Sequence, residues 1–388
     1  VPRICVRYEC VPMRFIKHVY KIHTYAQDGR LFEGKTPVSA FLNSSYDGSF
    51  IAGLMELRYI QSLPVERIIN YFESHGFTLK KPTAHKLMEK ASSLFENLYK
   101  CIRQTALSDP YKAADETYYK ILVPEKNSKG KGVRKGYLWV VVGINTRMIY
   151  LLYDDGSRSE KVILNELGGC KGIIQSDGYS PYRKLESDAY PHITRIPCLQ
   201  HIKRKFIDCG EDDPDAKRIV EMINTLYQNE HKHKIGVDGW TVEQNLVHRK
   251  KYAPDILGEI KDVLDDIEER GDLLPKSELK EAITYLRNEW NAVVDIFNYG
   301  DTYLDNNIVE RMNRYISLSR KNSLFFGSHK GAERGAILYT IALTCRMNKV
   351  NLFEYLTDVI NRTAEWQPNT PLEKYRLLLP DRWEKAND

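Results

Sequence analysis

The chain has 388 residues, which exceeds the usual size of a single hydrophobic core and predicts two or three domains. Hydrophobic residues make up 42% of the sequence and charged residues 28%, as in an ordinary globular protein with enough apolar side chains to form a core. The sequence has no run of about 18 apolar residues and no apolar core after its first positive charges, so we expect neither a transmembrane helix nor a signal peptide.

The net charge of +5 is mild, but the cations are clustered, at residues 120–135, 201–205 and 311–330. Clustered Lys and Arg side chains are compatible with nucleic acid as a partner. The cysteines are odd in number and have no framework spacing, which predicts reduced thiols in a cytoplasmic protein. They are Cys5, Cys10, Cys101, Cys170, Cys198, Cys209 and Cys345.

The first part of the chain is expected to be β-like and then helical. Residues 1–45 contain short β-like stretches and a polar linker, and residues 46–110 have helical periodicity. The second expected helix has Pro64 in its first turn and Gly76 just past its end, and a single long helix is expected over 78–104. Helix, glycine turn and helix form the outline of a helix-turn-helix, so this region is a candidate for DNA binding, with a plain helical bundle as the alternative.

Residues 111–210 have the pattern of a sheet. Strands are expected at 114–123, 136–144, 147–155, 172–177 and 193–199, and short helices at 159–168 and 180–187. Hairpin strands followed by strand, helix and strand predict an α/β fold with a mixed five-stranded sheet flanked by helices.

The rest of the chain is expected to be helical. Residues 211–300 are polar and predict a helical insertion, clearest at 214–228, 254–270 and 277–297. Residues 301–345 would return to the sheet domain with its last helix, and residues 346–388 would form a helical tail.

Two aspartates occur at the ends of expected strands. Asp115 is at the head of the first strand, and Asp177 is at the end of the fourth, where Gly178 turns the chain. Functional sites collect at strand ends in open sheets, and a carboxylate on a buried strand is costly unless it is paired or binds a cation. The alternative for each is an ordinary aspartate that caps a turn.

Glu310 lies in the stretch "DNNIVERMNRYISLSRKN", which has helical spacing and Asp305 as its expected N-cap. The expected buried face is Ile308, Val309, Met312 and Ile316, and the expected polar stripe is Asn306, Glu310, Asn313 and Arg314. The stripe could be merely solvated, with a Glu310–Arg314 pair that contributes only ~0.3–0.5 kcal/mol. Against this, asparagines are poor helix formers and an unusual choice for a solvated face.

Asp115, Asp177 and Glu310 together could hold two Mg²⁺ ions about 3.5–4 Å apart, which would stabilise the attacking and leaving oxygens of an in-line phosphoryl displacement. Hard oxygen ligands suit Mg²⁺, and nearby cations would bind the nucleic acid backbone. The sequence has no G-x-S-x-G elbow, P-loop or HExxH motif, which fits chemistry that needs no nucleophilic side chain.

At these residues the chain resembles the transposases of the insertion sequence 66 family, which are DDE enzymes with a ribonuclease-H-like core. The resemblance extends from about Ser49 to Trp383 and is most specific in the run that begins at Asp305. The matching stretches are "ADET", "IIQSDGYSPY", "PCLQHIKRKF", "DNNIVERMNRYISLSRKNSLFFGSHKGAERGAILYTI", "NLFEYLTDVI" and "LLLPDRW".

This resemblance implies that Asp115, Asp177 and Glu310 are the catalytic and metal-binding triad, with two Mg²⁺ ions and Mn²⁺ as a substitute. The implied reaction is cleavage at the element ends by activated water, followed by attack of the freed 3′-hydroxyl on target DNA. Because two DNA ends must be brought together, the resemblance implies a homo-oligomer on DNA, associated with the bacterial nucleoid, with element-encoded accessory proteins as compatible partners and no membrane. The implied DNA contacts are His201, Arg204, Lys205, Arg314, Arg320 and Lys321.

The N-terminal region departs from the family pattern. Related transposases carry a cysteine-paired, zinc-finger-like segment there, but no C-x-x-C follows "VYKIHTY" in this chain. Cys5 and Cys10 do not have the spacing of a standard zinc pair, so we expect residues 1–45 to be a degenerate zinc-finger-like region.

Several other residues are weaker candidates for metal or DNA binding, and each also has a simpler structural interpretation. Cys198 and His201 have C-x-x-H spacing, but one pair does not make a tetrahedral zinc site. His231 and His233 are expected to be solvated. Phe325 and Phe326 are expected to anchor the segment after Lys321 in the core, and the basic loop at 127–136 is expected to be a hairpin tip, with DNA contact as the alternative.

The sequence leaves two alternatives to a transposase function. The first is an inactive or repurposed DNA-binding protein derived from a transposase, which rests on the missing cysteine pair and the absent starting methionine. The second is a glycosidase that uses two carboxylates and needs no metal.

Overall fold

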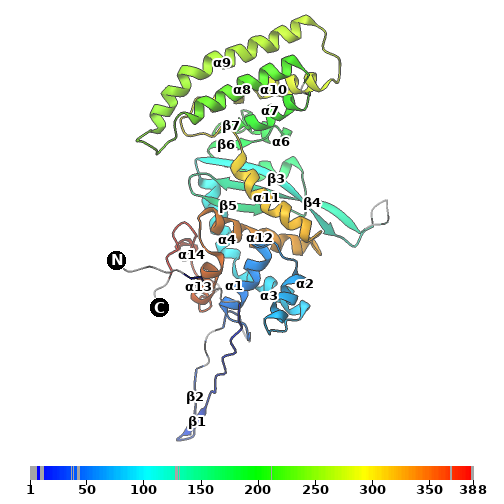
Figure 1. The fold of residues 1–388 in the computed structure, drawn as a ribbon. Helices are drawn as coiled ribbons and strands as arrows, with labels where there is room; N and C mark the ends of the chain where they lie inside the picture. Colours follow the sequence, from blue (N-terminus) through cyan, green and yellow to red (C-terminus); the bar gives the residue numbers. More distant parts are fainter. Residues whose placement is uncertain are drawn as a thin grey trace. The chain divides into compact units, whose positions relative to one another are not determined.

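The structure is a computed structural model of the chain, and it describes residues 7–8, 13–35, 37, 39–41, 44–126, 130, 132–210, 212–367 and 369–385 (Figure 1). The chain divides into two compact units. The helical unit contains residues 1–99, 318–324 and 337–388, and the sheet unit contains residues 100–317 and 325–336. Within the described part of the chain, no helix is both long enough and apolar enough to span a bilayer.

The helical unit begins with a small exposed hairpin and continues as packed helices. Strands β1 (Thr24–Gln27) and β2 (Arg30–Glu33) pair antiparallel. Helix α1 packs against α2, α3 and α13, and the side chain of Asp47 caps it by accepting a hydrogen bond from the Phe50 amide. The helices of this unit are α1 (Gly48–Tyr59), α2 (Val65–Ser74), α3 (Lys81–Leu94), α13 (Leu352–Thr363) and α14 (Leu372–Arg376).

The single long helix predicted over 78–104 is wrong. Two helices, α3 and α4 (Glu96–Ser108), meet at Phe95. Phe95 has φ −91° and ψ 2°, outside helical geometry, and its side chain is fully buried. The buried ring lies at the point where the two helices meet, and the helical periodicity of the sequence does not reveal this boundary.

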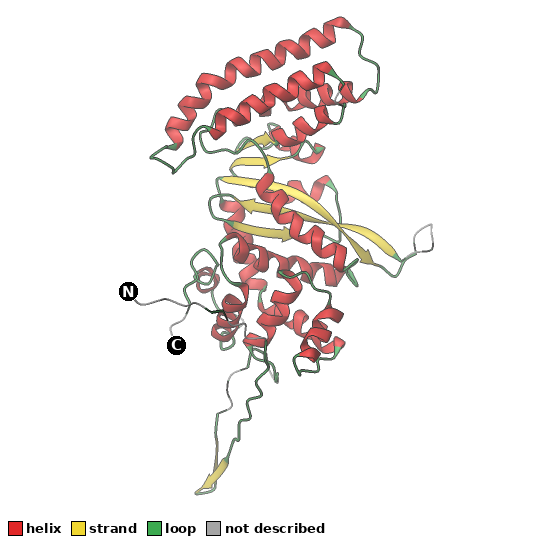
Figure 2. Cartoon of the chain, in the orientation of Figure 1, coloured by secondary structure: helices red, strands yellow, loops and turns green. Residues whose placement is uncertain are grey.

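A five-stranded mixed sheet is the centre of the sheet unit, as the sequence predicted (Figure 2). The strand order is β5-β4-β3-β6-β7, with β3, β4 and β5 antiparallel and β3, β6 and β7 parallel. The strands are β3 (Tyr111–Leu122), β4 (Val133–Gly143), β5 (Met148–Leu152), β6 (Gly172–Ser176) and β7 (Ile193–Pro197).

Helices cover the sheet. The continuous apolar run at 138–142 in β4 is buried on both faces, as expected for a central strand with layers on each side. The covering helices are α5 (Glu160–Leu167), α6 (Ser180–Arg183), α7 (Leu199–Ile207), α11 (Asn307–Asn322) and α12 (His329–Met347). Residues of α4, α11 and α12 are shared between the two units.

The predicted helical insertion consists of α8 (Pro214–His231), α9 (Val242–Arg270) and α10 (Glu278–Ile296), whose apolar faces form one core with α7. The second of these helices begins before the segment at 254–270 where the sequence pattern is clearest. Thr241 and Gln244 form a capping box that starts α9 earlier, and Pro254 lies inside the helix. Buried side chains on both sides of Pro254, at Ala253 and Leu257, offset the loss of one backbone hydrogen bond.

Candidate functional site

Asp115 lies on β3, and Asp177 directly follows β6, the strand that pairs parallel with β3. In the register between β3 and β6, Ala113 is opposite Gln175, so each aspartate comes two residues after a paired position. This places the two aspartates at corresponding positions of neighbouring chain segments. Asp177 is at the end of its strand, as predicted, but Asp115 is the fifth residue of β3 and not its head, and the sequence did not show that the two strands are adjacent.

Helix α11 brings the third carboxylate to β3. The side-chain amide of Asn306 donates to the Ala114 carbonyl at 3.0 Å, and that of Asn313 donates to Asp115 Oδ2 at 2.5 Å. Asn306 is 1% exposed and Asn313 is 9% exposed, so the solvated-stripe alternative is wrong for these two residues. Their short polar side chains donate hydrogen bonds to β3 at close range, and Glu310 lies between them in the first turn of α11. Asn306, and not Asp305 as predicted, directly precedes this helix.

Asp115 and Glu310 line one cavity of about 300 Å³ in the sheet unit. Its other lining residues are Glu116, Thr117, His201, Asn313, Arg314 and Ser317. The cavity therefore combines carboxylates from a strand and a helix with one arginine at its edge. This combination is suited to an anionic ligand held through a cation.

Several acceptor atoms in the cavity lack hydrogen-bond partners among the described residues. Glu310 Oε1 and Asn313 Oδ1 are buried and unpaired, and so is Nδ1 of His201. His201 Nδ1 lies 3.6 Å from Glu310 Oε1, which is too long for a hydrogen bond. Buried oxygens without donors are costly, and a bound cation would satisfy them. The donor set, carboxylate and amide oxygens, is the kind that fits Mg²⁺.

The carboxyl group of Asp115 has a strongly shifted pKa. Burial raises it first, the charges of Glu116 and Asp177 raise it further, and the result is about 8. Hydrogen bonds from the Glu116 amide and Asn313 oppose the shift. Crowded carboxylates of this kind resist ionisation in the absence of a counter-charge, and a divalent cation would supply one.

Glu116 is a fourth carboxylate that the sequence analysis missed. It forms an ion pair with Arg158 and accepts a hydrogen bond from the Tyr182 hydroxyl at 3.4 Å. Burial raises its pKa, although Arg158 opposes this shift. Its position next to Asp115 was the available signal, but strand alternation argued for opposite faces.

The turn after β6 also has the simpler feature expected of a strand-terminal aspartate. Asp177 Oδ1 accepts a hydrogen bond from the Tyr179 amide at 3.1 Å. The capping role and a role in the carboxylate cluster are compatible, because the charge of Asp177 also acts on Asp115.

The other predicted site residues lie in different places. Arg314 is exposed and lines the cavity, whereas Arg204 and Lys205 are exposed on α7 and do not line it. Arg320 and Lys321 belong to the helical unit, at the end of α11.

The prediction that Phe325 and Phe326 both anchor the core was half right. Phe326 is buried against Tyr119, but Phe325 is exposed, so the expectation that both anchor the core is wrong. Phe326 bonds through its backbone to β3, donating to the Lys120 carbonyl, and with Phe326 facing the core the preceding side chain, Phe325, points outward.

Zinc is poorly supported at the predicted cysteine. Ligand atoms of Cys198, His201 and Glu310 lie within 4.8 Å of one another. However, three ligand residues of which one is a carboxylate do not make a standard structural zinc site, and the Cys198 sulfur already accepts a hydrogen bond from the Asn306 backbone amide. Cys5 and Cys10 lie outside the described residues. His231 and His233 are exposed, as predicted, and His233 stacks on Trp240.

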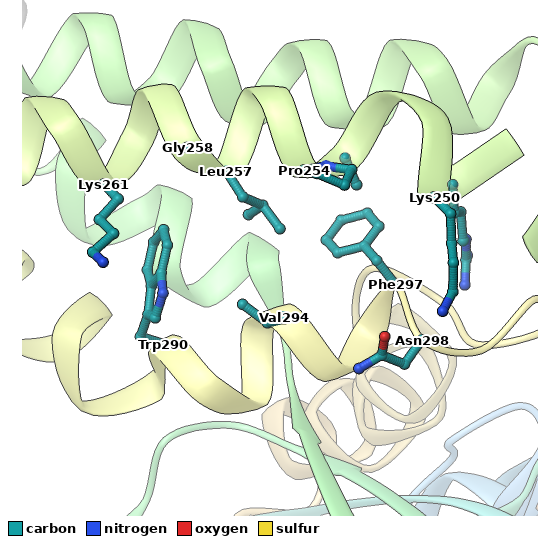
Figure 3. A pocket seen from close by; sticks show the side chains of 11 residues that line it. Lys250, Pro254, Leu257, Gly258, Lys261, Trp290, Val294, Phe297 and Asn298 are labelled. Carbon is teal, nitrogen blue, oxygen red and sulfur yellow. The ribbon is translucent and has the colours of Figure 1, made fainter.

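A second cavity, of about 370 Å³, lies between α9 and α10 (Figure 3). Leu257, Trp290, Val294 and Phe297 form its apolar lining, and no carboxylate lines it. It is larger than the carboxylate cavity, and its ionisable lining residues are all basic: Arg249, Lys250 and Lys261.

The shifted pKa of Asp115 predicts how stability depends on pH in metal-free buffer. Its folded-state pKa of about 8 exceeds the unfolded value of 3.8, so the folded protein holds a proton that the unfolded chain has lost. We therefore expect the free energy of unfolding to fall, by up to about 1.4 kcal/mol per pH unit, between pH 4 and 8. Thermal melts in EDTA from pH 5 to 8 would compare the protein with Asp115→Asn, in which the fall should be smaller, because the contribution of Asp115 is lost while that of Glu116, whose pKa is also raised, remains. Parallel pH profiles for the two proteins would contradict the expectation.

Comparison with known proteins identifies the family. Three similar proteins of Sinorhizobium fredii carry the names uncharacterized protein y4jD, y4hP and y4qI, with 26%, 24% and 26% identity over 86%, 98% and 95% of this chain. The chain spans 65% of the length of the first relative, 70% of the second and 69% of the third. The model of the family described as "Transposase IS66 family" matches residues 43–334, which include the five-stranded sheet, the insertion and the carboxylates of the site. The chain therefore belongs to the IS66 family of transposases.

Proposed function

We propose that this protein is a DNA transposase whose catalytic residues are Asp115, Asp177 and Glu310. The observation that carries the proposal is the cavity in which Asp115 and Glu310 meet, with a carboxylate oxygen that has no hydrogen-bond partner and with Asp177 directly after the adjacent strand β6. The strand order, with three antiparallel strands followed by two parallel ones, supports a ribonuclease-H-like core. The reaction is cleavage of a phosphodiester at the element end by water, then attack of the freed 3′-hydroxyl on target DNA.

Asp115, Asp177 and Glu310 would hold two Mg²⁺ ions, with Mn²⁺ as a substitute. When bound, these ions supply charge stabilisation for the attacking and leaving oxygens of an in-line displacement. The raised pKa of Asp115 and the unpaired Glu310 Oε1 are the two features of this chain that favour a cation there.

The neighbouring side chains orient the carboxylates and contact the DNA. Asn313 fixes Asp115 through its amide, and Asn306 holds α11 on β3. His201 stands beside Glu310. The exposed Arg314 is placed to contact a phosphate at the cavity. Further backbone contacts are proposed for Arg204, Lys205, Arg320 and Lys321.

The remaining parts of the chain have proposed supporting roles. Residues 46–110 recognise DNA, residues 211–300 are an insertion in the catalytic core, and residues 346–388 are a helical tail. A homo-oligomer on DNA would bring the two element ends together, and element-encoded proteins could assist it.

Replacement of Glu310 with glutamine tests the proposal. On DNA that carries the cognate element ends, we expect Mg²⁺-dependent cleavage to fall by about 10³-fold, because a ligand and its charge are lost at nearly constant shape. Glu259→Gln, an exposed position in the middle of α9, is the matched control and should cleave normally. Cleavage by Glu310→Gln at the control rate would overturn the assignment.

A further inference from the structure

We propose that helix α10 of the insertion is a working part of the carboxylate site, because it positions the turn that carries Asp177. Tyr285 and Glu289 act from α10 as positioning residues, and Arg195 of β7 links Glu289 to the turn. This inference rests on the proposed function. Within that function, the insertion sets the affinity of the carboxylate site for its divalent cation.

Asp177 lies just past the last residue of β6 that is paired in the sheet. The pairing of β6 with β3 ends at Gln175, and its pairing with β7 ends at Ser176. The carbonyl of Asp177 and the amide of Gly178 therefore need partners outside the strand ladder. Both partners involve the insertion.

The first partner is the hydroxyl of Tyr285. It accepts a hydrogen bond from the Gly178 amide at 2.8 Å. A Cβ atom added at Gly178 would lie 2.5 Å from the Tyr285 hydroxyl oxygen and 2.6 Å from two ring carbons. Gly178 does not have a positive φ, so backbone geometry does not require glycine there. Instead, the close approach of Tyr285 from α10 requires a glycine at this position.

The second partner is the guanidinium of Arg195, which is 1% exposed. It donates to the Asp177 carbonyl at 3.0 Å and to the Ser176 hydroxyl at 3.1 Å. The same guanidinium forms an ion pair with Glu289, which is also 1% exposed. Arg195 also forms an ion pair with Glu186, so two carboxylates hold its buried guanidinium, and Glu289 is the one that α10 contributes. Arg195 itself holds the turn.

This arrangement matters because metal ligands tolerate little displacement. A site of this kind must be held within about 0.5 Å of its productive geometry. Loss of a group that orients a ligand costs about 10–100-fold in metal affinity. The insertion therefore acts on the catalytic centre through two contacts with one turn, Tyr285 to Gly178 and Glu289 through Arg195 to Asp177.

A double-mutant cycle on the full-length protein tests the inference, with Mn²⁺ affinity measured by electron paramagnetic resonance. We expect Gly178→Ala and Tyr285→Ala each to weaken Mn²⁺ binding by about 10-fold. In the double variant the added methyl no longer meets the ring, so its affinity should equal that of Tyr285→Ala alone. Independent losses that multiply to about 100-fold would overturn the proposed contact.

Two further variants separate positioning from general stability and from the proposed function. Tyr252→Phe removes a hydroxyl that bonds to Glu230 elsewhere in the insertion, so it should lower the melting temperature but leave Mn²⁺ affinity unchanged. An equal loss of affinity in Tyr252→Phe would overturn a specific role for α10. Asp177→Asn should itself weaken Mn²⁺ binding. If Asp177→Asn weakens Mn²⁺ binding and the variants at Gly178 and Tyr285 do not, only this inference fails. If Asp177→Asn binds Mn²⁺ normally, the proposed function fails as well.

Discussion

Replacing Asp177 with asparagine is expected to abolish metal-dependent DNA cleavage and to leave the protein folded. Loss of a carboxylate that holds the cation removes roughly 4 kcal/mol or more of transition-state stabilisation, which corresponds to a rate loss of about 10³-fold. Folding should not suffer, because an asparagine oxygen can still accept the hydrogen bond from the Tyr179 amide. The substitution also removes one of the charges that raise the pKa of Asp115, so the metal-free protein should be slightly more stable.

Two measurements check this expectation together. Single-turnover cleavage of element-end DNA gives the rate, and thermal unfolding in EDTA gives the stability. Asp188→Asn is the matched control, since Asp188 is an exposed aspartate of the same unit that does not line the cavity. A variant at Asp177 that cleaves as fast as Asp188→Asn, or one that fails to fold, would contradict the expected separation of activity from stability.

The strands were predictable from sequence because their pattern is local. The run at 138–142 is apolar without interruption, and it became the central strand β4. Asp115 and Asp177 could be placed at strand positions for the same reason. Their adjacency depends on the parallel pairing of β3 with β6, which joins residues more than 60 positions apart, and local pattern does not determine such a pairing.

Helix ends were less predictable, because tertiary packing and capping decide them. The burial of Phe95 divides α3 from α4, and the capping box at Thr241 extends α9 through Pro254. In each case the sequence predicted the helical periodicity correctly but did not predict the helix boundary. Intrinsic helix propensity changes the free energy of a helix less than tertiary packing does.

The groups that support the site were invisible in the sequence. Asn313 was placed on the correct stripe, but its bond to Asp115 required the structure. Tyr285, Glu289 and Arg195 lie in different elements, and no spacing connects them with Asp177. Orienting residues act through long-range contacts, and a single sequence shows only short-range ones.

The largest expected effect on stability is at Arg249 of α9, which is 1% exposed. Its guanidinium makes two hydrogen bonds of 2.7 Å to the carboxylate of Glu230 on α8. It also donates to the carbonyls of Tyr299 and Thr302, both at 2.6 Å, in the segment that leads into α11. One side chain therefore joins two insertion helices to the chain that delivers Glu310.

Replacing Arg249 with methionine is expected to lower the free energy of unfolding by about 3–5 kcal/mol, because Glu230 loses its ion-pair partner and the carbonyls of Tyr299 and Thr302 lose their donor. For a unit of this size that corresponds to a fall of roughly 10 °C in melting temperature. Lys250→Met is the matched control, since Lys250 is the next residue and is exposed. The variant Arg249→Met/Glu230→Met should recover part of the loss, because removing both charges of a buried pair costs less than removing one. If Arg249→Met melts like Lys250→Met, or if the double variant is less stable than Arg249→Met alone, the buried pair does not tie the insertion to the segment before α11.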